Sequence, residues 1–320
     1  MSQHGKTVGW LVALAWLGAL ASWSAPQARM DGVHAAAMPA GVVAPAGTRQ
    51  LRDVAYGDDP LQRYDVYAPA GAHDAPVIVM VHGGGWRRGD KAMPGVVVNK
   101  LARWGARGFV VVSVNYRLLP RADLHAQLDD VARALASVQR RAAEWGGDGR
   151  RVVLMGHSAG AHLVALLAAR PSLAFGRGAS PWLGTVLLDS AALDVPAIMQ
   201  GPHFPLYDHA FGHDPAQWTA LSPLQQLQAR GAPVLAVCSS RRLESCPSAQ
   251  RFAARANALG TRAEVLEEDL GHGEINRELG LDSQYTRRVE RFLAGLDPRV
   301  AQLLGQPAAR VRGGVDGALR

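Results

Sequence analysis

The sequence predicts an α/β domain with a mostly parallel central sheet and helices on both faces of that sheet. Short runs that are apolar along their whole length alternate with longer runs that have the apolar period of a helix. Strands of the first kind are typical of a parallel sheet that is buried on both faces. A third observation is a serine on a glycine-bounded turn between one such strand and the helix after it, within residues 152–170.

The expected elements follow from these patterns in chain order. Strands are expected at residues 51–56, 62–67, 77–81, 109–114, 152–155, 185–188, 234–237 and 263–266. Helices are expected at residues 96–107, 124–145, 161–170, 248–259 and 285–296. The segment 191–231 contains prolines and mixed patterns, so only a small lid is expected there.

The composition is that of a globular protein with a sizeable core. Of 320 residues, 48% are hydrophobic and 19% are charged, and the formal net charge is +7. The arginines are scattered along the chain, and no block of lysine or arginine with interleaved aromatic residues occurs. The composition therefore argues against a nucleic-acid-binding protein.

The turn Gly156-His157-Ser158-Ala159-Gly160 has the features of a nucleophile elbow. Glycines lie two positions either side of Ser158 because a serine on a strained strand-to-helix turn leaves no room for larger side chains there. The turn also delivers Ser158 to a helix N-terminus, where unpaired N–H groups stabilise negative charge. An ordinary glycine-bounded turn is the alternative, so the assignment of Ser158 as nucleophile depends on the rest of the site.

A second glycine-rich stretch, His82-Gly83-Gly84-Gly85-Trp86, follows an expected strand directly. Acyl transfer by a serine needs backbone donors for the oxyanion of the tetrahedral intermediate. We expect Gly84 and Gly85 to supply them together with Ala159. A phosphate-binding loop is the alternative, but it would need a lysine and a serine or threonine after the glycines, and neither follows here.

His272 is the expected general base. It lies between two glycines after the last expected strand, where a loop would carry an imidazole to the carboxyl edge of the sheet. The remaining histidines have no such placement. His82 and His157 belong to the two motifs and are expected to be hydrogen-bonding neighbours of the site.

The carboxylate that orients His272 is the least determined member of the site. We expect Glu244, because it is the only acid in segment 238–247, which follows the expected strand 234–237. Asp194, after the preceding strand, is the alternative, and Asp189 is a weaker third candidate. Glu244 has a second interpretation, as a surface residue paired with a neighbouring arginine.

The two cysteines, Cys238 and Cys246, enclose the segment that carries Glu244. Such a pair in an exported protein usually forms a disulfide, and this one would fix the carboxylate. Two separate buried cysteines are the alternative. No histidine has the spacing for a zinc site with them, and no metal or organic cofactor is expected.

With these residues in place, the chain resembles α/β-hydrolases of the esterase/lipase type. The likeness is to small bacterial carboxylesterases of the hormone-sensitive-lipase and kynurenine-formamidase-like branches. It covers roughly residues 51–296 and rests on YGDDPLQRYDVYAPA, VHGGGWRRGDK, VSVNYRL, GGDGRRVVLMGHSAG, WTALSP and the GHG around His272. The resemblance implies an α/β-hydrolase fold, with Ser158 as nucleophile, His272 as base, and Gly84, Gly85 and Ala159 as oxyanion donors.

The chain departs from this family pattern in two places. The family's acid is usually an aspartate in a Gly- and Asp-rich turn, whereas this sequence has CSSRRLESCP there. No large helical cap is inserted between the strands, which favours an open site and short acyl groups. Trp86, Tyr116 and Phe211 are candidates for the lining of the pocket.

The sequence therefore predicts a serine esterase that cleaves esters of short-chain or small aromatic acyl groups through an acyl-enzyme on Ser158. A formamidase or amidase with the same site is the alternative within enzymes. The alternative of another class is a non-catalytic binding protein on the same fold. A small-molecule ester is the expected partner, with neither nucleic acid nor a stable membrane partner.

The domain organisation predicted from the sequence has four parts. Lys6, the apolar residues 8–21 and the small residues up to Ala25 predict a signal peptide at residues 1–25, and hence export to the periplasm or beyond. An uncleaved membrane anchor is the alternative. The other expected parts are a flexible linker at 26–47, the catalytic domain at 48–297 and a mobile tail at 298–320.

Overall fold

The computed structural model describes residue 42 and residues 44–306. The expected signal peptide lies outside the described residues, as do most of the expected linker and the last part of the expected tail. Within the described part, no helix is both long and apolar enough to cross a lipid bilayer.

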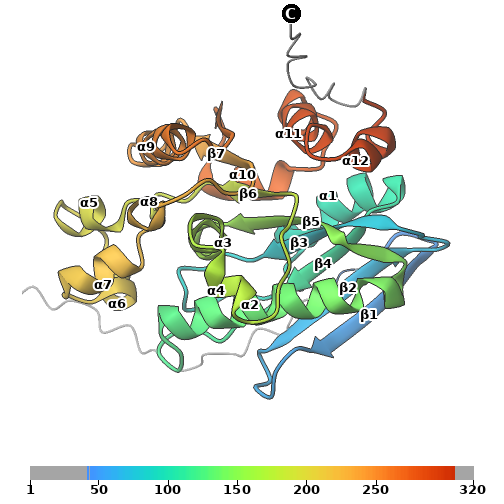
Figure 1. Cartoon of the computed structure of the whole chain (residues 1–320), viewed down its shortest axis with the longest axis horizontal. Helices are drawn as coiled ribbons and strands as arrows, with labels where there is room; N and C mark the ends of the chain where they lie inside the picture. Colours follow the sequence, from blue (N-terminus) through green and yellow to red (C-terminus); the bar gives the residue numbers. More distant parts are fainter. Residues whose placement is uncertain (1–41, 43, 307–320) are drawn as a thin grey trace, which may run out of the picture. The chain divides into compact units, whose positions relative to one another are not determined.

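Eight strands form one sheet in the order β1-β2-β4-β3-β5-β6-β7-β8 (Figure 1). The strands are β1 (Thr48–Ala55), β2 (Arg63–Pro69), β3 (Ala75–Val81), β4 (Val110–Val114), β5 (Gly147–His157), β6 (Gly184–Leu188), β7 (Val234–Ser239) and β8 (Ala263–Glu268). β2 runs antiparallel to both β1 and β4, and all other pairs are parallel. The carboxyl ends of β3, β5, β6, β7 and β8 therefore lie along one edge of the sheet.

Helices cover both faces of this sheet. They are α1 (Pro94–Trp104), α2 (Leu124–Arg141), α3 (Ala159–Ala169), α4 (Ser172–Phe175), α5 (Val195–Met199), α6 (Pro205–Phe211), α7 (Pro215–Ala220), α8 (Pro223–Gln226), α9 (Ser245–Ala258), α10 (His272–Glu278), α11 (Gln284–Ala294) and α12 (Pro298–Leu303), with short 3₁₀ turns at Gly105–Arg107 and Ala142–Trp145. Buried residues of α2, α3 and α9 pack on one face, and those of α1, α10, α11 and α12 pack on the other. Figure 1 shows α1 and α2 on opposite sides of the central strands.

Successive side chains along each strand point to opposite faces of the sheet and so belong to two separate hydrophobic cores. In β3, Val77, Val79 and Val81 belong to the core under α2 and α3. Ile78 and Met80 belong to the core under α1 and α11. Both sets are apolar, which is why the strand reads as a continuous apolar run.

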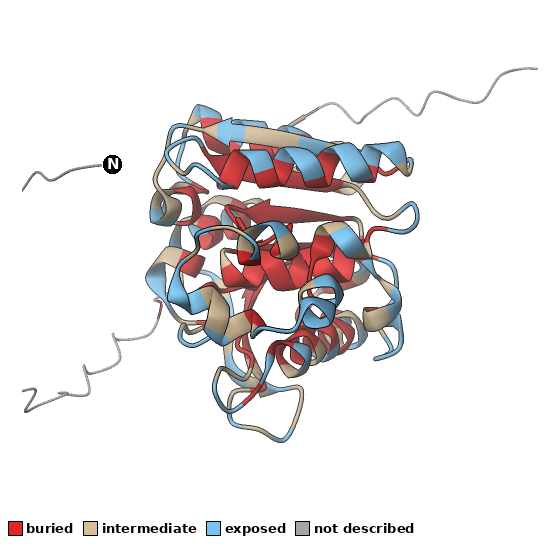
Figure 2. Ribbon diagram, turned by 90° about the vertical axis from the view of Figure 1, so that its left-hand side faces the viewer, coloured by how far each residue is buried: buried red, intermediate tan, exposed pale blue. Residues whose placement is uncertain are grey.

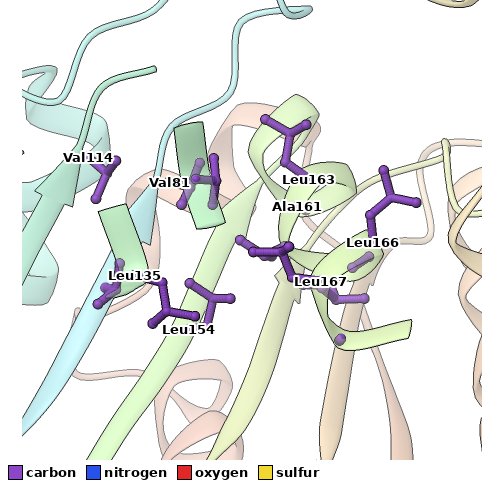
Figure 3. Packing of buried hydrophobic residues seen from close by; sticks show 14 of the residues in the cluster. Val81, Val114, Leu135, Leu154, Ala161, Leu163, Leu166 and Leu167 are labelled. Atoms are coloured by element: carbon purple, nitrogen blue, oxygen red, sulfur yellow. The ribbon is translucent and has the colours of Figure 1, made fainter. Parts of the chain in front are cut away.

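Helix α3 is the most deeply buried helix of the domain. Each of its residues is buried, and Figure 3 shows Ala161, Leu163, Leu166 and Leu167 packed near Leu154 of β5. Figure 2 shows buried residues gathered in the central strands and the inward sides of the helices. The helix that follows the serine is therefore held rigidly, which suits a site that depends on its N-terminus.

The predicted fold class is confirmed, and every expected strand and helix is present with shifted ends. The segment 191–231 forms four short helices, α5 to α8, each with a proline in its first two positions. The prolines that interrupt the sequence pattern therefore start helices, as their fixed φ allows.

Two C-terminal elements differ from the expectation. His272 begins helix α10 instead of lying on a loop, and Glu274 Oε2 accepts a hydrogen bond from the Gly271 N–H at 2.6 Å. The folded domain also continues beyond residue 297, because α12 buries Val300 and Ala301. The weak period of these short helices explains why the sequence pattern does not reveal them.

Candidate active site

Ser158 lies at the turn between β5 and α3, in a backbone conformation that residues other than glycine rarely adopt. Its φ is 55° and its ψ is −117°, and its N–H donates to Leu188 O on β6 at 2.9 Å. Gly160 allows the turn to sit close to β3, since a Cβ on Gly160 would lie 2.3 Å from Val81 O. The conformation is that of the nucleophile elbow expected from the motif.

His272 joins Ser158 to a carboxylate from a third element. His272 Nε2 lies 2.9 Å from Ser158 Oγ, and His272 Nδ1 lies 2.5 Å from Asp189 Oδ2. A proton on Nδ1 satisfies the carboxylate and leaves Nε2 as the acceptor for the serine hydroxyl. These three side chains have the hydrogen-bonding order of a serine–histidine–aspartate triad.

The acid in this arrangement is Asp189. The expectation that Glu244 would orient His272 is therefore wrong. Glu244 is exposed beside the start of α9 and has no hydrogen bond to His272. Asp194, the alternative, pairs with Arg251 at 3.1 Å instead. Asp189 directly follows β6, and that position on a central strand brings a carboxylate under the first residue of α10.

The predicted disulfide between Cys238 and Cys246 is present. It closes the loop between β7 and α9 as expected. The carboxylate that this loop holds, however, is that of Asp189, which follows β6. Ser239 N–H donates to Asp189 Oδ1 at 2.8 Å, and the Ser245 hydroxyl makes a short hydrogen bond to the same oxygen. We call residues 238–246 the disulfide loop.

Arg242, from the same disulfide loop, contacts the other carboxylate oxygen. Its Nη1 lies 2.6 Å from Asp189 Oδ2 and 3.0 Å from His272 Nδ1. Both nitrogens are donors, so Oδ2 accepts from the guanidinium and the imidazole together. Asp189 thus receives hydrogen bonds from four groups, three in the disulfide loop and one at the start of α10.

These contacts settle the charge of Asp189. Its side chain is fully buried, and burial alone would raise its pKa. The hydrogen bond with His272, the Arg242 cation and the bonds from Ser245 and Ser239 outweigh that effect and hold the pKa of Asp189 well below its usual range. Asp189 is therefore a carboxylate throughout the neutral pH range.

The glycine loop presents unpaired backbone donors beside Ser158. Gly84 and Gly85 have φ values of 118° and 60°, and among the described residues their N–H groups donate to no backbone oxygen. The Ala159 N–H is the first of α3 and has no acceptor within the helix. All three residues line one cavity with Ser158 and His272, of about 940 Å³.

The two motif histidines are buried hydrogen-bonding neighbours of the site. His157 Nε2 lies 2.9 Å from His272 O, and burial together with the nearby His272 lowers the pKa of His157 to about 3. His82 Nδ1 lies 2.7 Å from Gly83 O, and burial lowers its pKa too. A neutral His157 thus links the serine turn to the backbone of the base.

Of the three aromatic candidates, only Trp86 lines the cavity. Tyr116 is buried in the core, where its hydroxyl donates to His82 O at 3.0 Å, and Phe211 packs against Trp86. Trp86 Nε1 donates to Nδ1 of buried His162 at 3.3 Å, which gives that histidine a structural position. No group of three or more histidines, cysteines or acids in the described part of the chain is arranged to hold a metal ion.

Sequence reasoning singled out neither the contribution of Arg242 nor that of Ser239 and Ser245. Each contact joins residues about 50 positions apart, across two neighbouring strands. Asp189 did carry a signal, because it is the first residue after an apolar strand and a carboxylate there points to the functional edge of a parallel sheet.

The chain is similar to several known hydrolases. The BD-FAE family model matches residues 64–174. Esterase LipC of Mycobacterium tuberculosis is 38% identical over 117 residues, which are 36% of this chain and 28% of that protein. Kynurenine formamidase of Danio rerio is 35% identical over 150 residues, 45% of this chain and 48% of that protein. The match thus spans less than half the length of either relative.

A solved structure extends the likeness over most of the domain. A truncated carbohydrate esterase from gut microbiota superposes with a TM-score of 0.68 at 18% identity, over 82% of this chain and 100% of that one. The chain has the α/β-hydrolase fold. The resemblance to esterases of the α/β-hydrolase superfamily, which the sequence motifs predict, is confirmed by these matches.

Proposed function

We propose that the protein is a serine carboxylesterase that cleaves esters of short-chain or small aromatic acyl groups through an acyl-enzyme on Ser158. The observation that carries the proposal is the hydrogen-bonded series from Ser158 Oγ through His272 to Asp189. This series stands beside the unpaired N–H groups of Gly84, Gly85 and Ala159 in one cavity. Nucleophile, base, orienting acid and oxyanion donors are the parts that acyl transfer needs.

In the first half of the reaction, Ser158 Oγ attacks the ester carbonyl while His272 Nε2 takes its proton. The carbonyl oxygen becomes an oxyanion and accepts hydrogen bonds from the free backbone N–H groups. The imidazolium that forms carries its second proton on Nδ1, against the Asp189 carboxylate. His272 then gives the Nε2 proton to the leaving alkoxide, and the acyl group remains bonded to Ser158.

In the second half, water takes the place of the alcohol. Neutral His272 removes a proton from the water as it attacks the acyl carbon. Collapse of the second tetrahedral intermediate breaks the bond to Ser158 Oγ, which recovers its proton from His272. The products are the free acid and the regenerated enzyme.

The lid supports the size of acyl group that we propose. It consists of four short helices, and its residues Phe204, Leu206 and Tyr207 form part of the cavity wall. The cavity of about 940 Å³ has room for a small acyl group and its alcohol, and the four short helices add no large cap that would bury a long chain.

Hydrolysis of 4-nitrophenyl acetate and butyrate, with labelling by a fluorophosphonate, tests the proposal. We expect turnover and a single labelled residue, Ser158, with neither in Ser158→Ala. A folded protein that neither turns over these esters nor reacts with the fluorophosphonate would overturn the proposal. That result would favour a non-catalytic binding protein on the same fold.

A formamidase is the second candidate, because a kynurenine formamidase is among the relatives that match this chain. The same series of groups would attack a formyl amide, with His272 protonating the leaving nitrogen. The ratio of kcat/KM for N-formylkynurenine to that for 4-nitrophenyl acetate decides between them. A ratio well above one would replace the esterase proposal.

We further propose that the protein is exported and works in an oxidising compartment. The disulfide supports this proposal, since such bonds persist mainly outside the cytosol. The signal peptide expected at residues 1–25 would direct export. N-terminal sequencing of the protein recovered from a periplasmic fraction tests this, and an intact N-terminus in the cytosolic fraction would contradict it.

A further inference from the structure

The wall of the active-site cavity carries an excess of positive charge. Four arginines line it, namely Arg87, Arg88, Arg242 and Arg277. Asp189 is the one carboxylate in the lining, and its buried oxygens already accept bonds from His272 and Arg242. The lining therefore offers cations to a ligand and no free anion.

Arg87 and Arg88 are the two cations best placed to meet a substrate. They follow the glycine loop directly, and their N–H groups donate to Gly84 O at 3.3 and 3.2 Å. The turn that exposes the oxyanion donors thus also sets both arginines at the rim of the cavity. Both are exposed, and within residues 44–306 neither side chain pairs with a carboxylate. By contrast, Arg242 is committed to Asp189.

Arg277, on helix α10, adds one weaker cation to the lining. Arg277 is more than half exposed, and its carboxylate neighbours Glu278 and Glu274 are as far away as 3.7 and 3.9 Å. The glycine loop and helix α10 therefore both contribute positive charge to the cavity lining.

Apolar groups stand among these cations. Met93, Phe204 and Leu206 line the same cavity and are 47%, 70% and 38% exposed. A ligand that satisfies both features has an apolar body and a negative charge. A guanidinium matches the two oxygens of a carboxylate with two parallel hydrogen bonds.

We propose that the substrates of this site are esters that also bear a free carboxylate, which Arg87 and Arg88 bind at the rim while the ester carbonyl lies over Ser158. This inference rests on the proposed esterase function and adds the substrate class. Arg87 and Arg88 act as specificity residues in this assignment and take no part in the chemical steps.

Matched pairs of esters test the proposal on the whole protein. For a carboxylate on the acyl side, 4-nitrophenyl hemiadipate is compared with 4-nitrophenyl hexanoate. For one on the alcohol side, 4-acetoxybenzoate is compared with 4-acetoxybenzamide. We expect kcat/KM to favour the anion by about fivefold or more in at least one pair at low salt, and the preference to fall as salt is added.

The double variant Arg87→Gln/Arg88→Gln should lower this preference by about fivefold. The control Arg170→Gln/Arg230→Gln has the same change of charge and should leave the preference intact. Both control arginines are exposed, have no carboxylate partner among the described residues, and lie at the opposite edge of the sheet, after α3 and before β7.

The outcomes separate this inference from the function on which it rests. If neutral esters are hydrolysed and Ser158 is labelled, but neither pair favours the anion, the carboxylate proposal is overturned and the esterase proposal stands. An anion preference that survives in the Arg87/Arg88 variant overturns the role of these arginines. If no ester is hydrolysed and Ser158 is not labelled, the esterase proposal itself is overturned.

Discussion

The ends of β6 and β7 are neighbours in the sheet, yet they serve the site in different ways. The end of β6 supplies Asp189 itself, on the first residue after a central strand. The end of β7 supplies no acid and instead provides three groups, Ser239, Arg242 and Ser245, that hold Asp189 from outside. In the family pattern that the chain resembles, the acid would lie after the later strand.

This difference shows that the carboxylate that pairs with His272 is not restricted to the loop after one particular strand. Two adjacent strands end within reach of His272, so either can carry the acid. Where β6 carries the acid, the disulfide loop after β7 can instead hold that acid by hydrogen bonds, so we call this loop the clamp on Asp189. The Cys238–Cys246 disulfide closes it. The first three predictions below separate the effect of Asp189 from that of the disulfide loop that holds it.

Replacement of the acid should have the largest effect. Asp189→Asn puts an amide donor against His272 and Arg242, and favours the wrong tautomer of the imidazole. We expect kcat for 4-nitrophenyl acetate to fall by about 10³-fold or more, with little change in KM. A fall of less than tenfold would remove Asp189 from the triad.

Loss of a clamp hydroxyl should have a smaller effect on the same step. Ser245→Ala deletes one of the two donors to Asp189 Oδ1, so kcat should fall by about tenfold while fluorophosphonate still labels Ser158. Ser240→Ala is the matched control, because Ser240 is exposed on the same loop and does not contact Asp189. Equal losses in the two variants would show a general effect of the loop.

Opening the disulfide should loosen the clamp without removing it. We expect the variant Cys238→Ser/Cys246→Ser to lose about fivefold in kcat and about 2–3 kcal/mol in the free energy of unfolding, as estimated for a loop of this length. Dithiothreitol should reproduce the kcat loss in the natural protein and leave the variant unchanged. Full activity after verified reduction would refute a role for the disulfide in positioning Asp189.

Asp189 and the buried His162 should affect the free energy of unfolding in different ranges of acidic pH. The low pKa of Asp189 means that its contribution to stability is present above about pH 4, the unfolded value, and is lost only below it. Burial lowers the pKa of His162 to about 4, so between pH 6.5 and 4 only the unfolded chain binds its proton and stability falls.

His162→Gln should therefore flatten the loss of stability between pH 7 and pH 5. We expect the difference in the free energy of unfolding between these pH values to shrink by about 1–2 kcal/mol, measured by urea denaturation. An unchanged pH dependence would show that other groups dominate the acid response.

The smallest effects are expected at the two acids that lie near the site without serving it. Glu244→Gln and Asp194→Asn should each change kcat by less than about twofold, because neither carboxylate contacts His272. A large loss in Glu244→Gln alone would restore the carboxylate first expected from the sequence.

The sequence predicted the features that depend on local contacts, and it failed for those that depend on contacts between distant residues. The elbow around Ser158 and the glycine loop are local, since strand, turn and helix follow one another within a few residues. His272 was recognised by its place after the last strand, although the helix that it begins was not. The choice of Glu244 as the acid was wrong, because Asp189, Asp194 and Glu244 all follow neighbouring strands and only side-chain reach across the sheet separates them.

The disulfide loop also bears on where this protein becomes active. A chain that folds in a reducing compartment would carry Ser158, His272 and Asp189 in place, but with the clamp on Asp189 unlocked. If the protein is exported as we propose, oxidation would then act as a maturation step that raises turnover without proteolysis. The redox state of its surroundings would thus decide how much of the folded protein works at full rate.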